Sequence, residues 1–120
     1  MKEIKLAPVE SKFADIIWRC EPVKSGELVK TCQTELEWKR TTTYTVLKKL
    51  CDRGIFKNEG GIVSAVIKKD DFYSMQGEQL IEDAFDGSLP AFIAAFTKRN
   101  ALSDSEIKEI RQMIDDYGKE

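Results

Sequence analysis

The sequence predicts a mainly α-helical protein with a small β-hairpin, organised as a winged helix-turn-helix followed by a C-terminal helical region. Three observations support this fold class. Amphipathic helical patterns run up to residue 53, a β-branched segment with a Gly-Gly turn follows, and helical patterns then resume. Three short helices followed by a hairpin is the element order of a winged helix. A boundary near residues 68–71 gives a first domain of residues 1–70 and a second of residues 71–120.

The first two helices are expected on either side of Pro22. The first begins near Pro8, which the first turn of a helix tolerates. Its apolar stripe is Val9, Phe13, Ile16 and Ile17. Ser25 can cap the second helix. The inward residues of that helix are expected to be Leu28, Val29, Cys32 and Leu36.

The third helix is expected over residues 41–53, and Gly54 follows it, where a helix end favours a left-handed residue. Its inward residues are expected to be Thr43, Val46, Leu47 and Leu50. Residues 55–58 and 62–68 then read as two strands. The Gly60-Gly61 pair between them permits the positive φ angles of a hairpin turn.

Helical patterns return after residue 71, in three segments. Gly87 can end the first and Ser88 can cap the second. Ser103 and Glu106 have the spacing of a capping box at the start of the third. The apolar residues are Leu80, Ile81, Ala84 and Phe85 in the first segment, Leu89, Phe92, Ile93 and Phe96 in the second, and Ile107, Ile110, Ile114 and Tyr117 in the third. The 3-4-3 spacing of the last set suits packing along a narrow seam.

Composition limits the classes of function. No apolar run approaches the ~20 residues that span a bilayer, and the N-terminus lacks the apolar core of a signal peptide, so we expect a cytoplasmic protein without membrane contact. The chain has no histidine, and Cys20, Cys32 and Cys51 do not form a C-x-x-C motif. We therefore expect no enzymatic activity, no metal, no cofactor and three reduced thiols.

Charge is unevenly distributed along the chain. Residues 1–69 hold fourteen Lys and Arg against nine Asp and Glu, whereas residues 70–120 hold five against twelve. Residues 39–57 alone hold six basic residues and one acidic residue. A basic patch this local in an acidic protein is typical of phosphate binding.

Four threonines cluster at the start of the third helix, although each is about half a kcal/mol worse than alanine as a helix former. In a major groove, a threonine methyl can pack on a thymine methyl while its hydroxyl bonds a base edge or a phosphate. The alternative is that Thr41 or Thr42 caps the helix and the rest is a solvated face. The expected DNA-binding residues are Lys39, Arg40, Thr41, Thr42, Tyr44, Thr45, Lys48, Lys49 and Lys57.

Several stretches resemble, in order and over nearly the whole chain, the penicillinase repressor family of bacterial winged-helix regulators. They are LAPVESKFADIIWRCEPVKSGELV, EWKRTTTYTVLKKLCDRG, and FDGSLPAFIAAF followed by LSDSEI. The matching positions are Glu10, Trp18, Pro22, Val23, Glu37, Trp38, Thr42, Thr45, Leu50, Gly54, Phe85, Gly87 and Ser88. The resemblance implies a homodimer that binds an inverted-repeat operator through its third helix and represses genes, typically for β-lactam resistance or, in a related branch, copper handling.

The resemblance also implies that residues 71–120 form the dimerisation domain. Three short amphipathic helices in this length bury too little apolar area to be stable alone, which independently favours a partner. The expected dimerisation residues are Leu80, Phe85, Phe92, Phe96, Ile107, Ile110, Ile114 and Tyr117. Phe92 and Phe96 could instead belong to the core of their own subunit.

The chain departs from the family pattern in four places. Lys39-Arg40 replaces a Ser-Pro pair, so the N-cap of the third helix is expected at Thr41. The hairpin lacks the family's Arg and Tyr pattern. The Asn-Phe bond that a sensor protease cuts in the penicillinase branch is matched by Ala95-Phe96. No cysteine follows Cys51, so the Cys-x-Cys cluster of the copper branch is missing.

Two hypotheses of different classes remain. The first is a dimeric bacterial transcriptional repressor, whose partners are a double-stranded DNA operator, a second copy of the chain and a sensor protease acting on the tail. The alternative is a winged-helix adaptor that has lost sequence-specific DNA binding. Such an adaptor would hold another protein through its uncharged hairpin or its Phe-rich helices.

Overall fold

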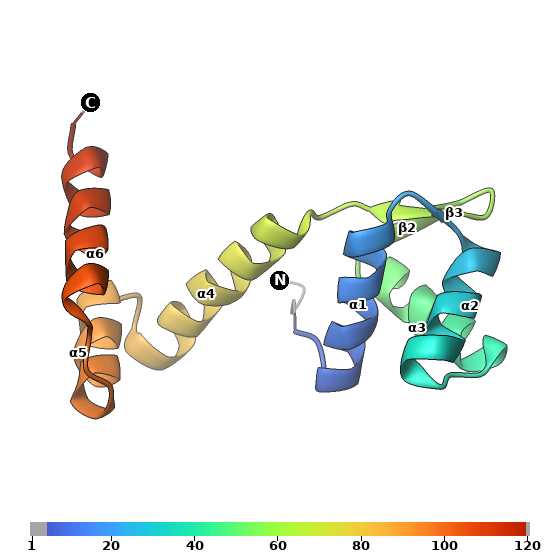
Figure 1. Cartoon of the computed structure of the whole chain (residues 1–120), viewed down its shortest axis with the longest axis horizontal. Helices are drawn as coiled ribbons and strands as arrows, with labels where there is room; N and C mark the ends of the chain where they lie inside the picture. Colours follow the sequence, from blue (N-terminus) through green and yellow to red (C-terminus); the bar gives the residue numbers. More distant parts are fainter. Residues whose placement is uncertain (1–4, 120) are drawn as a thin grey trace. The chain divides into compact units, whose positions relative to one another are not determined.

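A computed structural model describes residues 5–119 (Figure 1). These residues form a three-stranded sheet of β1 (Val23–Lys24), β2 (Phe56–Glu59) and β3 (Ile62–Ala65), together with helices α1 (Pro8–Cys20), α2 (Ser25–Leu36), α3 (Arg40–Asp52), α4 (Lys69–Phe85), α5 (Leu89–Arg99) and α6 (Asp104–Tyr117). The mainly helical fold class, with a winged helix and C-terminal helices, is confirmed. The chain divides into two compact units between Gly77 and Glu78, inside α4, and the predicted boundary at residue 70 lies at the start of that helix.

The first unit is built around a closed apolar core to which α1, α2, α3 and the β2–β3 hairpin contribute (Figure 1). The buried members of this core are Phe13, Ala14, Ile16, Ile17, Leu28, Cys32, Leu47, Leu50, Ile55, Phe56, Val63 and Phe72. Thr43 is also fully buried. The predicted stripes of α1, α2 and α3 are thus largely correct. Val9 is the exception, because it lies in the first turn of α1 and is 49% exposed.

The hairpin forms where it was predicted. Gly60 and Gly61 have φ angles of 59° and 84°, and β2 pairs antiparallel with β3 across them. The second strand is shorter than expected, because the N–H groups of Val66 and Ile67 both donate to the Ile55 carbonyl instead of extending the ladder. A two-residue strand that the sequence did not reveal, β1, pairs with the other edge of β3.

Two predicted helix caps are wrong. Ser25 is the first residue of α2 rather than its N-cap, because its N–H donates to the Gly61 carbonyl at 2.8 Å and ties it to the hairpin turn. The N-cap of α3 is Lys39, not Thr41, and Lys39 gives no side-chain capping bond. The predicted end of α3 is correct, since Gly54 has a φ angle of 80°.

The first turns of α4 belong to the first unit. Phe72 is buried, and its ring centroid lies 5.3 Å from that of Trp18. The Trp18 indole N–H donates to the Ile67 carbonyl at 3.0 Å, and Glu21 accepts from the Ala65 N–H at 2.9 Å. Helix α1 therefore holds the segment that leads from β3 into α4.

The second unit contains well-formed helix ends but no enclosed core. Ser88 accepts from the Ala91 N–H, as predicted for the cap of α5. Ser103 and Glu106 form the predicted capping box of α6, with reciprocal bonds of 3.1 and 3.0 Å. Between residues 78 and 119 no residue is buried. Local signals thus define these helices, while their apolar side chains remain largely open to solvent.

Cys20, Cys32 and Cys51 are free thiols. Burial raises the pKa of the Cys32 thiol to about 11 and raises that of Cys51 as well. Among residues 5–119, no group of His, Cys, Asp and Glu side chains is arranged to hold a metal ion. No helix in that range is both long and apolar enough to cross a bilayer.

Candidate nucleic-acid interface

The outward face of α3 carries most of the predicted DNA-binding residues. The inward positions Thr43, Leu47 and Leu50 are fully or almost fully buried. The helix repeat therefore turns the opposite face to solvent. The exposed residues of this face are Thr41, Thr42, Thr45, Lys48 and Lys49, and Arg40 and Lys39 are exposed where the helix begins.

Three of the basic residues on this face have no acidic partner. In the described part of the chain, no carboxylate lies within ion-pair distance of Lys39, Arg40 or Lys48. The first turn of α3 contains no acidic residue. Since a helix N-terminus favours anions, the cations at positions 39 and 40 oppose the helix dipole. The beginning of α3 therefore presents uncompensated positive charge to solvent.

The four threonines of α3 have different roles. Thr43 is buried and donates to the Lys39 carbonyl at 3.3 Å, while Thr45 donates to the Thr41 carbonyl at 2.8 Å. Within residues 5–119, Thr41 and Thr42 make no hydrogen bond through their hydroxyls. Thr45 keeps its acceptor lone pairs because its bond uses only the hydroxyl hydrogen. Three threonines therefore retain hydrogen-bonding capacity for a ligand.

Tyr44 is held in place by protein contacts. Its side chain is half-buried, and its hydroxyl donates to Ser25 Oγ at 3.1 Å. The Arg40 guanidinium lies over its ring, 5.4 Å from the centroid. Tyr44 thus links the start of α3 to the start of α2, a role that its position on α3 did not indicate.

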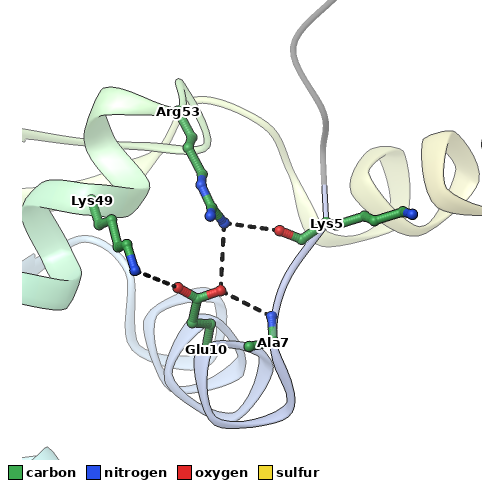
Figure 2. Close-up of polar contacts among 5 residues, drawn as sticks. All are labelled: Lys5, Ala7, Glu10, Lys49 and Arg53. Carbon is green, nitrogen blue, oxygen red and sulfur yellow. Dashed lines mark hydrogen bonds and ion pairs between the residues drawn. The ribbon is translucent and has the colours of Figure 1, made fainter.

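Glu10 connects α1 to the last turns of α3 (Figure 2). The residue is only 9% exposed. Its carboxylate accepts from the Ala7 N–H at 2.9 Å and lies 3.4 Å from Arg53 Nη1 and 3.8 Å from Lys49 Nζ. Arg53 also donates to the Lys5 carbonyl at 2.9 Å. The Ala7 bond and then the two cations hold the pKa of Glu10 below its ordinary value. Lys49, a predicted DNA-binding residue, therefore already has a partial counter-charge within the protein.

The hairpin contributes little free positive charge. Lys57, the predicted DNA-binding residue on β2, lies 3.5 Å from Glu59. At the base of the hairpin, Lys68 pairs with Glu21 and Lys69 with Asp15, each at 3.4 Å. The two exposed apolar side chains in this region are those of Ile62 and Val66, at 41% and 56%.

The predicted dimerisation residues lie on α4, α5 and α6 of the second unit. Phe85 and Phe92 stack edge to face with centroids 5.5 Å apart, and Phe92 lies 6.3 Å from Phe96. The exposed members of the set are Leu80 (51%), Phe96 (45%), Ile114 (63%) and Tyr117 (89%). Phe85, Phe92, Ile107 and Ile110 are half-buried. Phe92 therefore contributes to packing within the unit, while Phe96 presents nearly half of its surface to solvent.

Sequence reasoning missed Glu10 and Ser25 as parts of this interface. Glu10 stands three residues after Ala7, the spacing of a capping box, but alanine lacks the hydroxyl of the usual signature. Ser25 has the residue type and position of a helix N-cap. Their true partners lie 43 and 19 residues away in the chain, so no local pattern could identify them.

Comparison with known proteins yields one family match and several relatives. The penicillinase repressor family model matches residues 6–116. The chain is 25% identical to a penicillinase repressor of Staphylococcus aureus, over 98% of this chain and 97% of the relative. It is 22% identical to a penicillinase repressor of Bacillus licheniformis, over 98% and 95%. It is 20% identical to the methicillin resistance regulatory protein MecI of Staphylococcus aureus, over 94% and 95%.

Proposed function

Since the chain belongs to the penicillinase repressor family, we propose that it is a transcriptional repressor that binds an inverted-repeat DNA operator as a homodimer. Members of this family are regulators of transcription, not enzymes. The names of the relatives point to genes of β-lactam resistance as the class of target. A repressor of this kind works in the cytoplasm, where bacterial DNA lies.

The observation that carries this proposal is the outward face of α3. Lys39, Arg40 and Lys48 have no carboxylate partner within residues 5–119, and threonine hydroxyls accompany them on the same face. Phosphate oxygens of DNA supply the missing anions, and base edges in the major groove supply partners for the hydroxyls. In helix-turn-helix proteins the N-terminal residues of the recognition helix contact the bases. We infer that α3 is the recognition helix.

The open apolar surface of the second unit supports the homodimer. A unit without one buried residue between positions 78 and 119 gains little stability from its own packing. A second copy would cover Leu80, Phe96, Ile114 and Tyr117, which are the exposed members of the predicted dimerisation set. Two-fold symmetry in the protein then matches two-fold symmetry in the operator.

A binding titration tests the proposal. The wild-type chain should shift DNA from upstream of its own gene more strongly than random DNA of equal length, with affinity that falls steeply as salt rises. The double variant T42A/T45A should lose specific affinity by about 1–3 kcal/mol per base contact removed, and should bind random DNA almost as the wild type does.

Thr34→Ala is the matched control for that variant. Thr34 is exposed on α2 and donates to the Lys30 carbonyl at 3.2 Å, just as Thr45 donates to Thr41. The control should therefore reproduce any effect on helix stability of losing a threonine that donates to the carbonyl four residues earlier, without changing operator binding. Equal binding of wild type and T42A/T45A to operator would exclude α3 as the reader.

The adaptor alternative is not favoured by the family match. Its one structural support is the hairpin, where Ile62 and Val66 are exposed and Lys57 is paired with Glu59. An adaptor would show no preference between the upstream DNA and random DNA in the titration above.

Control by a sensor protease is the remaining part of the proposal. The bond between Ala95 and Phe96 lies within α5, and both residues are exposed. Proteolysis favours open loops, so α5 must unfold locally before this bond is cut. An immunoblot of induced cells should then show two fragments, and a helix-destabilised variant, Ala94→Gly, should form them faster.

A further inference from the structure

We propose that Arg40 reads one guanine in each operator half-site and that Tyr44 and Ser25 are positioning residues that hold it for this contact. The inference rests on the proposed function and deepens it, because it assigns a base to one side chain. Three linked contacts and one electrostatic conflict support it.

The contacts form a chain from α3 to the hairpin. The Arg40 guanidinium lies over the Tyr44 ring at 5.4 Å from its centroid. The Tyr44 hydroxyl donates to Ser25 Oγ at 3.1 Å, and the Ser25 N–H donates to the Gly61 carbonyl at 2.8 Å. Each partner therefore restricts the next. An arginine that rests on a fixed aromatic ring loses less side-chain entropy when it binds a ligand.

The charge of Arg40 has no counterpart nearby in the protein. It is the first residue of α3, the helix has no acidic residue in its first turn, and no carboxylate of residues 5–119 lies within ion-pair distance of it. A cation at a helix N-terminus is unfavourable. An aromatic ring attracts the guanidinium through its face but accepts none of its five N–H donors in their own plane. The edge of the guanidinium is therefore free for a planar ligand with two acceptors.

Guanine offers that pair of acceptors. In the major groove its O6 and N7 atoms accept two parallel N–H bonds from one guanidinium, whereas adenine pairs one acceptor with a donor. A phosphate can also bind a guanidinium through two oxygens. The position of Arg40 favours the base, because the first residues of a recognition helix reach base edges.

Selection of bound sequences from random DNA tests the assignment. The wild type should enrich a guanine at one position of each half-site. Arg40→Ala should lose the guanine preference at that position alone, and should bind the wild-type consensus about 5- to 150-fold more weakly, the range for one bidentate base contact. Replacing that guanine by 7-deazaguanine removes N7. It should weaken the wild type and leave Arg40→Ala unchanged.

Two further variants separate positioning from general structure. Tyr44→Phe keeps the ring under Arg40 but removes the bond to Ser25, and Ser25→Ala removes the same bond from the other side. Both should reduce guanine enrichment to a similar degree, and the double variant should lose no more enrichment than either single variant. Lys48→Ala is the matched control, since it removes an unpaired cation of α3 outside this chain of contacts.

If Arg40→Ala keeps the guanine and weakens binding to all sequences equally, with a salt slope reduced by about one, Arg40 holds a phosphate and the inference is wrong. If Tyr44→Phe and Ser25→Ala leave guanine enrichment intact, the positioning roles are wrong. If the wild type enriches no sequence, the proposed function itself fails, and the assignment of Arg40 fails with it.

Discussion

Both units of the chain contain well-formed helices, but the first unit buries its apolar side chains and the second leaves many of them exposed. In the first unit Phe13, Ile17 and Leu50 have no exposed surface at all. In the second unit Leu80 and Ile114 are more than half exposed, although the caps at Ser88 and Ser103 are well made. Caps and amphipathic patterns define helices, whereas burial depends on contacts between distant elements. The first unit buries a core of apolar side chains within itself, and the second leaves much of its apolar surface open to solvent.

The largest expected effect is in the core of the first unit. Phe13→Ala should destabilise folding by about 3–5 kcal/mol, because it removes a fully buried ring and leaves a cavity among α1, α2 and α3. Thermal unfolding should show this loss equally at low and high protein concentration. Val9→Ala is the control on the same helix, and a similar loss there would mean that exposure does not distinguish the two positions.

A smaller effect that depends on concentration is expected in the second unit. Phe96→Ala should weaken the dimer by about 2 kcal/mol, the lower limit for a central aromatic side chain in an interface. Sedimentation at several concentrations should show that, on dilution, the variant dimer dissociates at a total concentration about thirtyfold higher than the wild-type dimer does. Lys98→Ala serves as the control on the same helix. A wild type that is monomeric at every concentration would contradict the proposal that a second copy covers the apolar surface of the second unit.

Glu10 tests the polar link within the first unit. Glu10→Gln should cost about 1–3 kcal/mol of folding stability, since the ion pairs of a nearly buried carboxylate with Arg53 and Lys49 are lost, although the amide oxygen can still accept from the Ala7 N–H. In the folded protein the pKa of Glu10 lies below its ordinary value of 4.5. The wild type should therefore be more stable than Glu10→Gln by the full amount above pH 4.5, and this difference in stability should disappear as the pH falls through the folded pKa. Urea unfolding at pH 7 and at lower pH measures this. Glu27→Gln, which removes an exposed ion pair with Lys30, should show neither effect.

The smallest effect concerns a helix end in the second unit. Ser103→Ala should destabilise α6 by about 1 kcal/mol, because the Glu106 N–H loses its acceptor. Circular dichroism during heating should show the loss. Ser105→Ala, two residues further along and already inside the helix, should be neutral or slightly stabilising. Equal loss from both variants would show that the capping box does not contribute.

The comparison also explains which features the sequence predicted. Ser88 and Ser103 were identified as caps because donor and acceptor lie three residues apart. Ser25 and Thr41 are also residues that commonly cap helices. At Ser25, however, the backbone N–H binds the distant Gly61 carbonyl, and α3 begins at Arg40, before Thr41. Strand β1 was missed because two residues carry no periodicity. The exposed face of α3 was predictable from its buried stripe, whereas the Arg40–Tyr44–Ser25 contacts depend on how α2 and α3 pack.

Gly77 occupies an interior position of α4, at the end of the first unit. No neighbouring atom would obstruct a Cβ there, so packing does not explain the glycine. Glycine in a helix interior costs about 1 kcal/mol relative to alanine. By residue type, this 17-residue helix is therefore least stable at the position next to the division between the two units.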